Sequence, residues 1–151
     1  MQKFTIESSA FINGGEIPKK YGYKYDNVSP PIKIQGVPAD ANSLALIMDD
    51  PDAMKAVGKV WVHWLVWNIN PKTLEISEGL IPSGSAEGKT DFDEIGYGGP
   101  APPDKRHTYV FKLFALQTKL ELKQGSTKAQ LENSMKGKIL DQAILKGTFA
   151  P

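Results

Sequence analysis

The sequence contains no cysteine in its 151 residues. This absence excludes disulfide bonds, thiolate catalysis and thiolate metal sites, and it is typical of proteins that work in a reducing interior. No apolar run reaches the roughly eighteen residues of a membrane-spanning helix. Residues 1–7 alternate apolar and polar side chains where a signal peptide would have a hydrophobic core. We therefore expect a cytoplasmic protein without stable insertion into a membrane.

An excess of charge of either sign is also missing. Eighteen Lys and Arg residues stand against 17 Asp and Glu residues, which leaves a formal net charge of +1. Such a chain has no long-range field that would draw it to nucleic acid or to an anionic membrane. Its length suits one domain with one hydrophobic core. We expect a single domain over residues 1–151 and no nucleic-acid partner.

Helical periodicity is scarce, and most of the chain reads as strands separated by proline- and glycine-rich connections. A helix is predicted only after Ser126 or Thr127, either of which can cap it, and Gly137 should end it. Residues 54–59 are expected to form a mobile connection and residues 139–142 a short turn. Many strands with little helix indicate an antiparallel β-sandwich. The segments with strand character are residues 4–8, 32–35, 43–49, 60–68, 109–116 and 143–149.

The strongest of these strands is the run Val60-Trp-Val-His-Trp-Leu-Val-Trp-Asn68, which is apolar on nearly every position. Such a run predicts a strand buried on both faces. His63 is its one ionisable residue. By two-residue alternation His63 should share a face with Trp61, Leu65 and Trp67. Taken alone, a buried histidine is most simply explained by a hydrogen bond to a backbone carbonyl.

Three further polar residues lie where a strand meets a loop. Asp50 follows a buried strand, while His107 and Tyr109 lie on one face at the start of another. If these strands neighbour the one that carries His63, the four side chains converge beside the Gly98-Gly99-Pro100 turn. Imidazole and phenol groups would then supply donors to an oxyanion. Asp50 would orient a histidine or receive a ligand ammonium group.

Two other chemistries fit the residues less well. Two histidines and one carboxylate can hold a metal, but their wide sequence separations match no local metal motif. Ser83 and Ser85 lie in no nucleophile elbow. Acid–base catalysis by His63, His107 and Asp50 is a weaker alternative. We expect no metal, no cofactor and no catalytic residue.

Three motifs follow one another in a fixed order along the chain. They are Ala-Leu-Ile-Met-Asp-Asp-Pro-Asp-Ala at 45–53, Trp-Val-His-Trp-Leu-Val-Trp-Asn-Ile at 61–69, and Gly-Tyr-Gly-Gly-Pro-Ala-Pro-Pro at 96–103 with Arg-His-Thr-Tyr at 106–109. Together they resemble the phosphatidylethanolamine-binding protein family, also called the Raf kinase inhibitor protein family, and in particular its compact bacterial and archaeal branch. The resemblance implies a mostly β fold, with a large antiparallel sheet packed on a smaller one and a short C-terminal helix. It also implies one small anion pocket near the surface.

The resemblance also assigns the pocket residue by residue. Members often carry unusual cis peptides there, for which Asp50–Pro51 and Lys59–Val60 are the candidates. The sequence departs from the family pattern at Met54, where a proline is usual, at Thr108, where an arginine is usual, and at Thr90, where prokaryotic members tend to have asparagine. The implied ligand-binding residues are Asp50, Trp61, His63, Gly99, Pro100, His107 and Tyr109.

The family resemblance favours a non-enzymatic protein with a regulatory or inhibitory role. Its ligand would be a small anion, such as phosphate, a phosphorylated headgroup or a carboxylate, and a protease or kinase is a possible partner. The alternative is an inhibitor of serine proteases or carboxypeptidases. An inhibitor needs a surface segment that enters a protease cleft, and residues 54–59 and 82–93 are the candidates.

Overall fold

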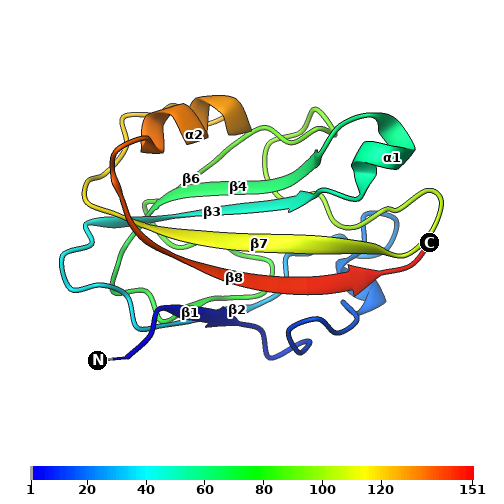
Figure 1. Ribbon diagram of the computed structural model, residues 1–151, viewed down its shortest axis with the longest axis horizontal. Coiled ribbons are helices and arrows are strands. Elements are labelled where there is room, and N and C mark those ends of the chain that lie inside the picture. The colour runs from blue at the N-terminus through cyan, green and yellow to red at the C-terminus, as the bar shows by residue number, and fades with distance from the viewer. Residues whose placement is uncertain (1) are drawn as a thin grey trace.

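Two antiparallel β-sheets form the body of the protein in the computed structural model, which describes residues 2–151. The larger sheet lies between α2 on one side and β1 and β2 of the smaller sheet on the other (Figure 1). The smaller sheet has the order β1-β2-β5, and the larger sheet β6-β4-β3-β7-β8. The elements are β1 (Thr5–Glu7), η1 (Lys19–Tyr21), β2 (Ile32–Gln35), β3 (Ser43–Asp50), α1 (Ala53–Val57), β4 (Trp61–Ile69), β5 (Glu75–Ile76), β6 (Ala86–Glu87), β7 (His107–Leu116), α2 (Lys128–Met135) and β8 (Ile139–Phe149).

The central strand of the larger sheet, β3, is buried at every position because both of its faces are covered. Leu46 and Met48 pack into the core between the two sheets. Ala45 and Ile47 pack on the opposite face, in a second core that includes Leu131 of α2. The predicted fold, a large antiparallel sheet packed on a smaller one with a short C-terminal helix, is confirmed. No helix within residues 2–151 is long and apolar enough to cross a bilayer.

The predicted C-terminal helix also agrees with the structure. Thr127 caps α2 through a capping box, in which its side chain accepts from Gln130 N and the Gln130 side chain accepts from Thr127 N. Gly137 follows the helix with a φ of 75°, a conformation that favours glycine. Leu131 and Met135, one turn apart, are the buried positions through which α2 packs on the sheet.

Three local predictions were wrong. Residues 53–57 form the helix α1, ended by Gly58 at φ 81°, where a mobile connection was expected. Residues 139–142 begin β8 instead of forming a turn, since Ile139 pairs with Leu116 of β7 and local periodicity does not report such long-range pairing. Every peptide bond in the described residues is trans, including those after Asp50 and Lys59. The trans form avoids the cost of about 3–4 kcal/mol that a cis bond imposes outside proline.

A β-bulge interrupts β4 at His63. Met48 of β3 pairs with Trp64, whereas the next residue, Asp49, pairs with Val62, so His63 is the extra residue. Bulges redirect side chains and are frequent beside functional sites. Here Leu65 and Trp67 join Val62 in the core under α2, whereas the His63 ring packs against Tyr109, which belongs to the other core. The prediction that His63 shares a face with Leu65 and Trp67 was therefore wrong.

Candidate functional site

The four polar residues singled out by the sequence meet at one end of the larger sheet. Antiparallel pairing of β3 with both β4 and β7 places the end of β3 beside the starts of its neighbours. Asp50 ends β3, His63 forms the bulge of β4, and His107 and Tyr109 begin β7. All four are buried, with exposed fractions between 0% and 3%. Together they line a cavity of about 210 Å³.

Apolar side chains form the rest of the cavity lining. Most of these residues belong to α1, the start of β4 and the loops before β7. None of them carries a charge. Such a wall around a few convergent polar groups is typical of a small-molecule site. Met54, one of the departures from the family pattern, lies on the solvent side of α1 and is 52% exposed. The apolar lining residues are Ala53, Ala56, Val57, Trp61, Phe92, Ala101 and Pro103.

Two predicted residues, Gly99 and Pro100, do not line this cavity. Gly99 N donates to Asn27 Oδ1 at 2.7 Å, and a Cβ at Gly99 would lie 2.0 Å from Tyr21 O. The glycine therefore permits close packing of two loops behind the site. Pro100 lines a separate hollow with Tyr25. Gly98 contributes its carbonyl, which accepts from His63 Nδ1 at 2.6 Å.

His107 lies between two carboxylates. Its Nδ1 donates to Asp50 Oδ2 at 2.6 Å and its Nε2 to Asp104 Oδ1 at 2.7 Å. Burial by itself lowers the pKa of His107, but the hydrogen bonds to Asp50 and Asp104 outweigh it, and the pKa is raised above its ordinary value. The ring is thus favoured as an imidazolium that donates from both nitrogens. The sequence did not single out Asp104. The one feature that could have identified it is its position three residues before His107.

His63 lies in the opposite electrostatic environment. Burial lowers its pKa below the ordinary histidine value, against weaker opposing effects from the Gly98 carbonyl and the Asp50 charge. The ring is therefore neutral at neutral pH. Because Nδ1 carries the proton donated to Gly98 O, Nε2 of the neutral ring is an acceptor. The carbonyl bond agrees with the simplest explanation of a buried histidine, while the ring also lines the cavity.

Two buried polar atoms at the cavity have no hydrogen-bond partner among residues 2–151. They are Asp50 Oδ1 and the Tyr109 hydroxyl. Burial, followed by the charge of Asp50, raises the pKa of Tyr109, so the phenol keeps its proton. The Asp50 side chain and the Ala101 backbone lie close enough to the hydroxyl to affect this pKa, but neither forms a hydrogen bond of good geometry with it. Buried polar atoms without partners are rare in folded proteins and each requires an explanation. A bound polar group would satisfy both of them.

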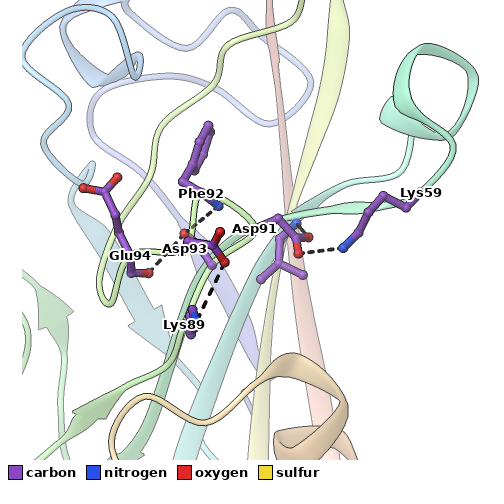
Figure 2. Close-up of polar contacts among 8 residues, drawn as sticks. Lys59, Lys89, Asp91, Phe92, Asp93 and Glu94 are labelled. Carbon is purple, nitrogen blue, oxygen red and sulfur yellow. Dashed lines mark hydrogen bonds and ion pairs between the residues drawn. The ribbon is translucent and has the colours of Figure 1, made fainter.

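The loop at residues 89–94, whose polar contacts are drawn in Figure 2, contributes Phe92 to the cavity wall. Asp91 accepts from Lys59 Nζ at 2.6 Å and from Val62 N at 2.7 Å, which ties the loop to the start of β4. This attachment places Phe92 edge-on to both Trp61 and His63. Phe92 also stacks on Tyr23, with ring centroids 4.0 Å apart. The sequence contains no pattern that would have identified Phe92 as a wall residue.

Of the two other departures from the family pattern, Thr90 has a local role through its side chain, whereas the contact at Thr108 is made by the backbone. Thr90 is buried, and its hydroxyl accepts from Phe92 N and donates to Glu94 O. Thr108 N donates to Asp52 Oδ2 at 2.8 Å, so the turn after β3 is held against the start of β7. Within the described residues, no group of three or more His, Cys, Asp or Glu side chains is arranged to hold a metal ion.

Comparison with known proteins identifies the family. The family model described as phosphatidylethanolamine-binding protein matches residues 7–150. A UPF0098 protein of Methanothermobacter thermautotrophicus is 42% identical over 150 residues, covering 96% of this chain and 97% of the relative.

Solved structures agree with this match. The crystal structure of a phosphatidylethanolamine-binding protein homolog from Chlamydia trachomatis superposes with a TM-score of 0.92 at 38% identity, over 99% of this chain and 98% of that one. YbcL of E. coli, described as a member of the mammalian family, superposes with a TM-score of 0.91 at 28% identity and 98% coverage of both chains. Sequence motifs, fold and these relatives agree, and the chain belongs to the phosphatidylethanolamine-binding protein family.

Proposed function

We propose that this protein is a non-enzymatic binding protein for small molecules that carry a phosphate or carboxylate group, with a regulatory or inhibitory role. The observation that supports this proposal is the pair of buried, unpartnered polar atoms, Asp50 Oδ1 and the Tyr109 hydroxyl, in a largely apolar cavity. Buried polar atoms are nearly always hydrogen-bonded in folded proteins, so these two are available to the polar groups of a ligand.

The polar atoms restrict the chemistry of the ligand. The Tyr109 hydroxyl can donate to an anionic oxygen, and His63 Nε2 can do so once the ring is protonated. Asp50 Oδ1 is an acceptor and needs a donor from the ligand. The favoured ligand therefore combines an anionic oxygen with an O–H or N–H group, as a protonated phosphate monoester or a phosphate beside an ammonium group does. The family description names phosphatidylethanolamine, whose headgroup has this combination.

The size of the cavity restricts the ligand further. Its volume of about 210 Å³ is below the roughly 300–1,000 Å³ of sites for drug-sized ligands. A headgroup or another small phosphate compound fits this space, and a longer apolar part would extend over α1. Met54 and Val57 of α1 are 52% and 51% exposed and offer an apolar surface beside the cavity.

Titration with sulfate, inorganic phosphate and phosphoethanolamine, followed by NMR of the histidine side chains, tests this proposal. The sequence contains two histidines, so each ring signal is assigned with one variant, His63→Gln. We expect all three anions to shift the His63 signals and Tyr109→Phe to weaken the response. Shifts confined to residues far from His63 and Tyr109 would place the binding site elsewhere and contradict the proposal.

The same exposed pair on α1 also favours the second candidate, protease inhibition. Met54 and Val57 lie in the first of the two segments expected to enter a protease cleft. The second segment, residues 82–93, is tied to the body through β6 and Asp91. A panel of serine proteases and carboxypeptidases, assayed with the protein and with its Met54→Ser/Val57→Ser variant, tests this function. Inhibition that the double substitution leaves unchanged would exclude α1 as the inhibitory segment.

A further inference from the structure

The Asp104 carboxylate is the surface end of a hydrogen-bonded chain that reaches the cavity. Its side chain is 42% exposed, whereas the His107 side chain is fully buried and that of Asp50 is 4% exposed. Asp104 does not itself line the cavity, but His107 and Asp50 do. The chain therefore runs from Asp104 Oδ1 through both ring nitrogens of His107 to Asp50 Oδ2, and the other Asp50 oxygen is the unpartnered atom at the cavity.

The remaining groups around His107 cannot replace Asp104. On the β8 side the paired residue is Phe149, which has no charge. The neighbouring Arg106 donates to Glu16 and Thr148, and Asp52 accepts from Thr108 N. On the cavity side Tyr109 is a protonated phenol, and His63 of β4 donates to Gly98 O. Among the described residues, Asp50 and Asp104 are the two hydrogen-bond partners of the His107 ring.

We propose that Asp104 is a positioning residue that holds His107 doubly protonated and thereby controls the charge that Asp50 presents to the ligand. A neutral imidazole has one N–H donor and one acceptor, so it cannot donate to two carboxylates at once. Two carboxylates on opposite nitrogens therefore select the imidazolium. Its positive charge compensates Asp50, which would otherwise repel an anion that enters the cavity.

The substitution Asp104→Asn tests this role because it removes the charge and keeps the shape and an acceptor oxygen. Asp40→Asn is the matched control, since Asp40 is exposed and precedes β3 at the end opposite Asp50. The first readout is the pKa of His107 measured by NMR without any ligand. We expect a lower pKa in Asp104→Asn and no change in Asp40→Asn.

The second readout is sulfate affinity as a function of pH, and it rests on the proposed binding function. Between the lowered His107 pKa of the variant and the raised His107 pKa of the unsubstituted protein, Asp104→Asn should bind sulfate about two- to fivefold more weakly than the unsubstituted protein, a range set by the measured strength of partly exposed ion pairs. Below both pKa values the ring is charged in both proteins and above both it is neutral in both, so the difference should disappear on either side of this window. A merely structural role of Asp104 would weaken binding equally at every pH.

The two readouts separate two kinds of failure. An unchanged His107 pKa in Asp104→Asn would overturn the role of Asp104, whether or not sulfate binds. If the His107 pKa is lowered but the sulfate affinities of the two proteins stay equal at every pH, the charge of His107 does not affect the ligand. That result would also overturn the proposed role of Asp104. Absence of sulfate binding to the unsubstituted protein would count against the binding function, while the ligand-free pKa would still decide whether Asp104 holds the ring charged.

Discussion

The Tyr109 hydroxyl is the residue-scale feature that most clearly distinguishes a binding site from an ordinary core. The side chain is fully buried, yet its oxygen has no hydrogen-bond partner within residues 2–151. If Tyr109 served packing alone, a phenylalanine at this position would pack equally well. We therefore propose that the hydroxyl serves to donate a hydrogen bond to a ligand.

Tyr109→Phe should separate binding from stability. Because the hydroxyl forms no hydrogen bond of good geometry with the protein, its removal should change the free energy of unfolding little. Sulfate affinity should fall by at least about tenfold, since a hydrogen bond to a charged group contributes about 1.5–3 kcal/mol. Urea denaturation and calorimetric titration measure the two quantities. A loss of stability with unchanged sulfate affinity would show that the hydroxyl has a structural partner and no role in binding.

Sulfate affinity should also depend on pH through His63. The folded-state pKa of His63 is lowered by burial, so the ring is neutral until the pH falls below the ordinary value of about 6.5. Protonation makes Nε2 a donor, and affinity should rise as the pH falls through the lowered pKa. Calorimetric titration of sulfate from alkaline to mildly acidic pH checks this, because sulfate does not titrate there. An affinity that is flat across this range would leave Tyr109 and backbone amides as the donors.

The lowered pKa of His63 also reduces the free energy of unfolding at acidic pH. The unfolded chain takes up a proton at His63 at a higher pH than the folded chain does, so this residue makes stability fall as the pH drops from about 6.5 toward the lowered pKa. A bound anion opposes this loss by favouring the protonated ring. His107 acts in the opposite direction: its raised pKa contributes stability that is fully present below about 6.5 and is lost as the pH rises through the raised value.

At the scale of elements, the loop at residues 89–94 and the bulged strand β4 depend on each other. Asp91 N donates to Val62 O at 3.1 Å, and the Asp91 carboxylate accepts from Val62 N. Val62 immediately precedes the bulge at His63. The loop thus satisfies backbone groups of β4 and at the same time presents Phe92 to the cavity (Figure 2).

Asp91→Ala should destabilise the protein by about 1–3 kcal/mol, because Val62 N loses the acceptor that satisfies it. Lys59→Met is the matched control, since it removes the other partner of Asp91. The Lys59 side chain is 53% exposed, and exposed ion pairs contribute only about 0–1 kcal/mol. Urea denaturation of the two variants checks this order. Equal losses would assign the role of Asp91 to the ion pair and not to the backbone of β4.

At the scale of the whole molecule, the site depends on loop packing outside the cavity lining. Residues 98–100 lie against η1 and the segment after it, where Tyr23 N donates to Pro100 O. Gly99 lies within this contact, and a side chain there would meet the backbone of Tyr21 and Gly22. Gly99, which was predicted to form the rim, thus affects the site indirectly. It lets the N-terminal segment approach the loop that carries Gly98 O, the hydrogen-bond acceptor of His63.

Gly99→Ala should destabilise the protein by about 1–3 kcal/mol, the usual range for overpacking. It should also weaken sulfate binding, because the displaced loop carries Gly98 O. Gly137→Ala is the control: it follows α2, nothing lies within 4 Å of its Cβ, and its positive φ alone costs about 1–2 kcal/mol. Thermal unfolding and sulfate titration of both variants test this. Sulfate binding that Gly99→Ala leaves unchanged, or weakens no more than Gly137→Ala does, would contradict this role of the glycine.

The sequence by itself determined the main strands and the C-terminal helix, and it singled out Asp50, His63, His107 and Tyr109 as candidates. Apolar runs, capping residues and polar groups at strand ends are local patterns, so they can be recognised without knowledge of the fold. The family motifs then implied which strands adjoin, and pairing of β3 with β4 and β7 follows that implication.

The tertiary structure alone decided which atoms the cavity presents. The bulge that turns His63 away from Leu65 and Trp67 arises from the register with β3, which the sequence of β4 does not encode. The pairing that makes residues 139–142 a strand depends on β7. Whether Asp104 reaches His107, and whether Gly99 faces the cavity or Tyr21, depends on loop paths fixed by contacts between residues far apart in the chain. Local sequence patterns do not encode those contacts, because burial and hydrogen bonding at these positions are properties of the assembled fold.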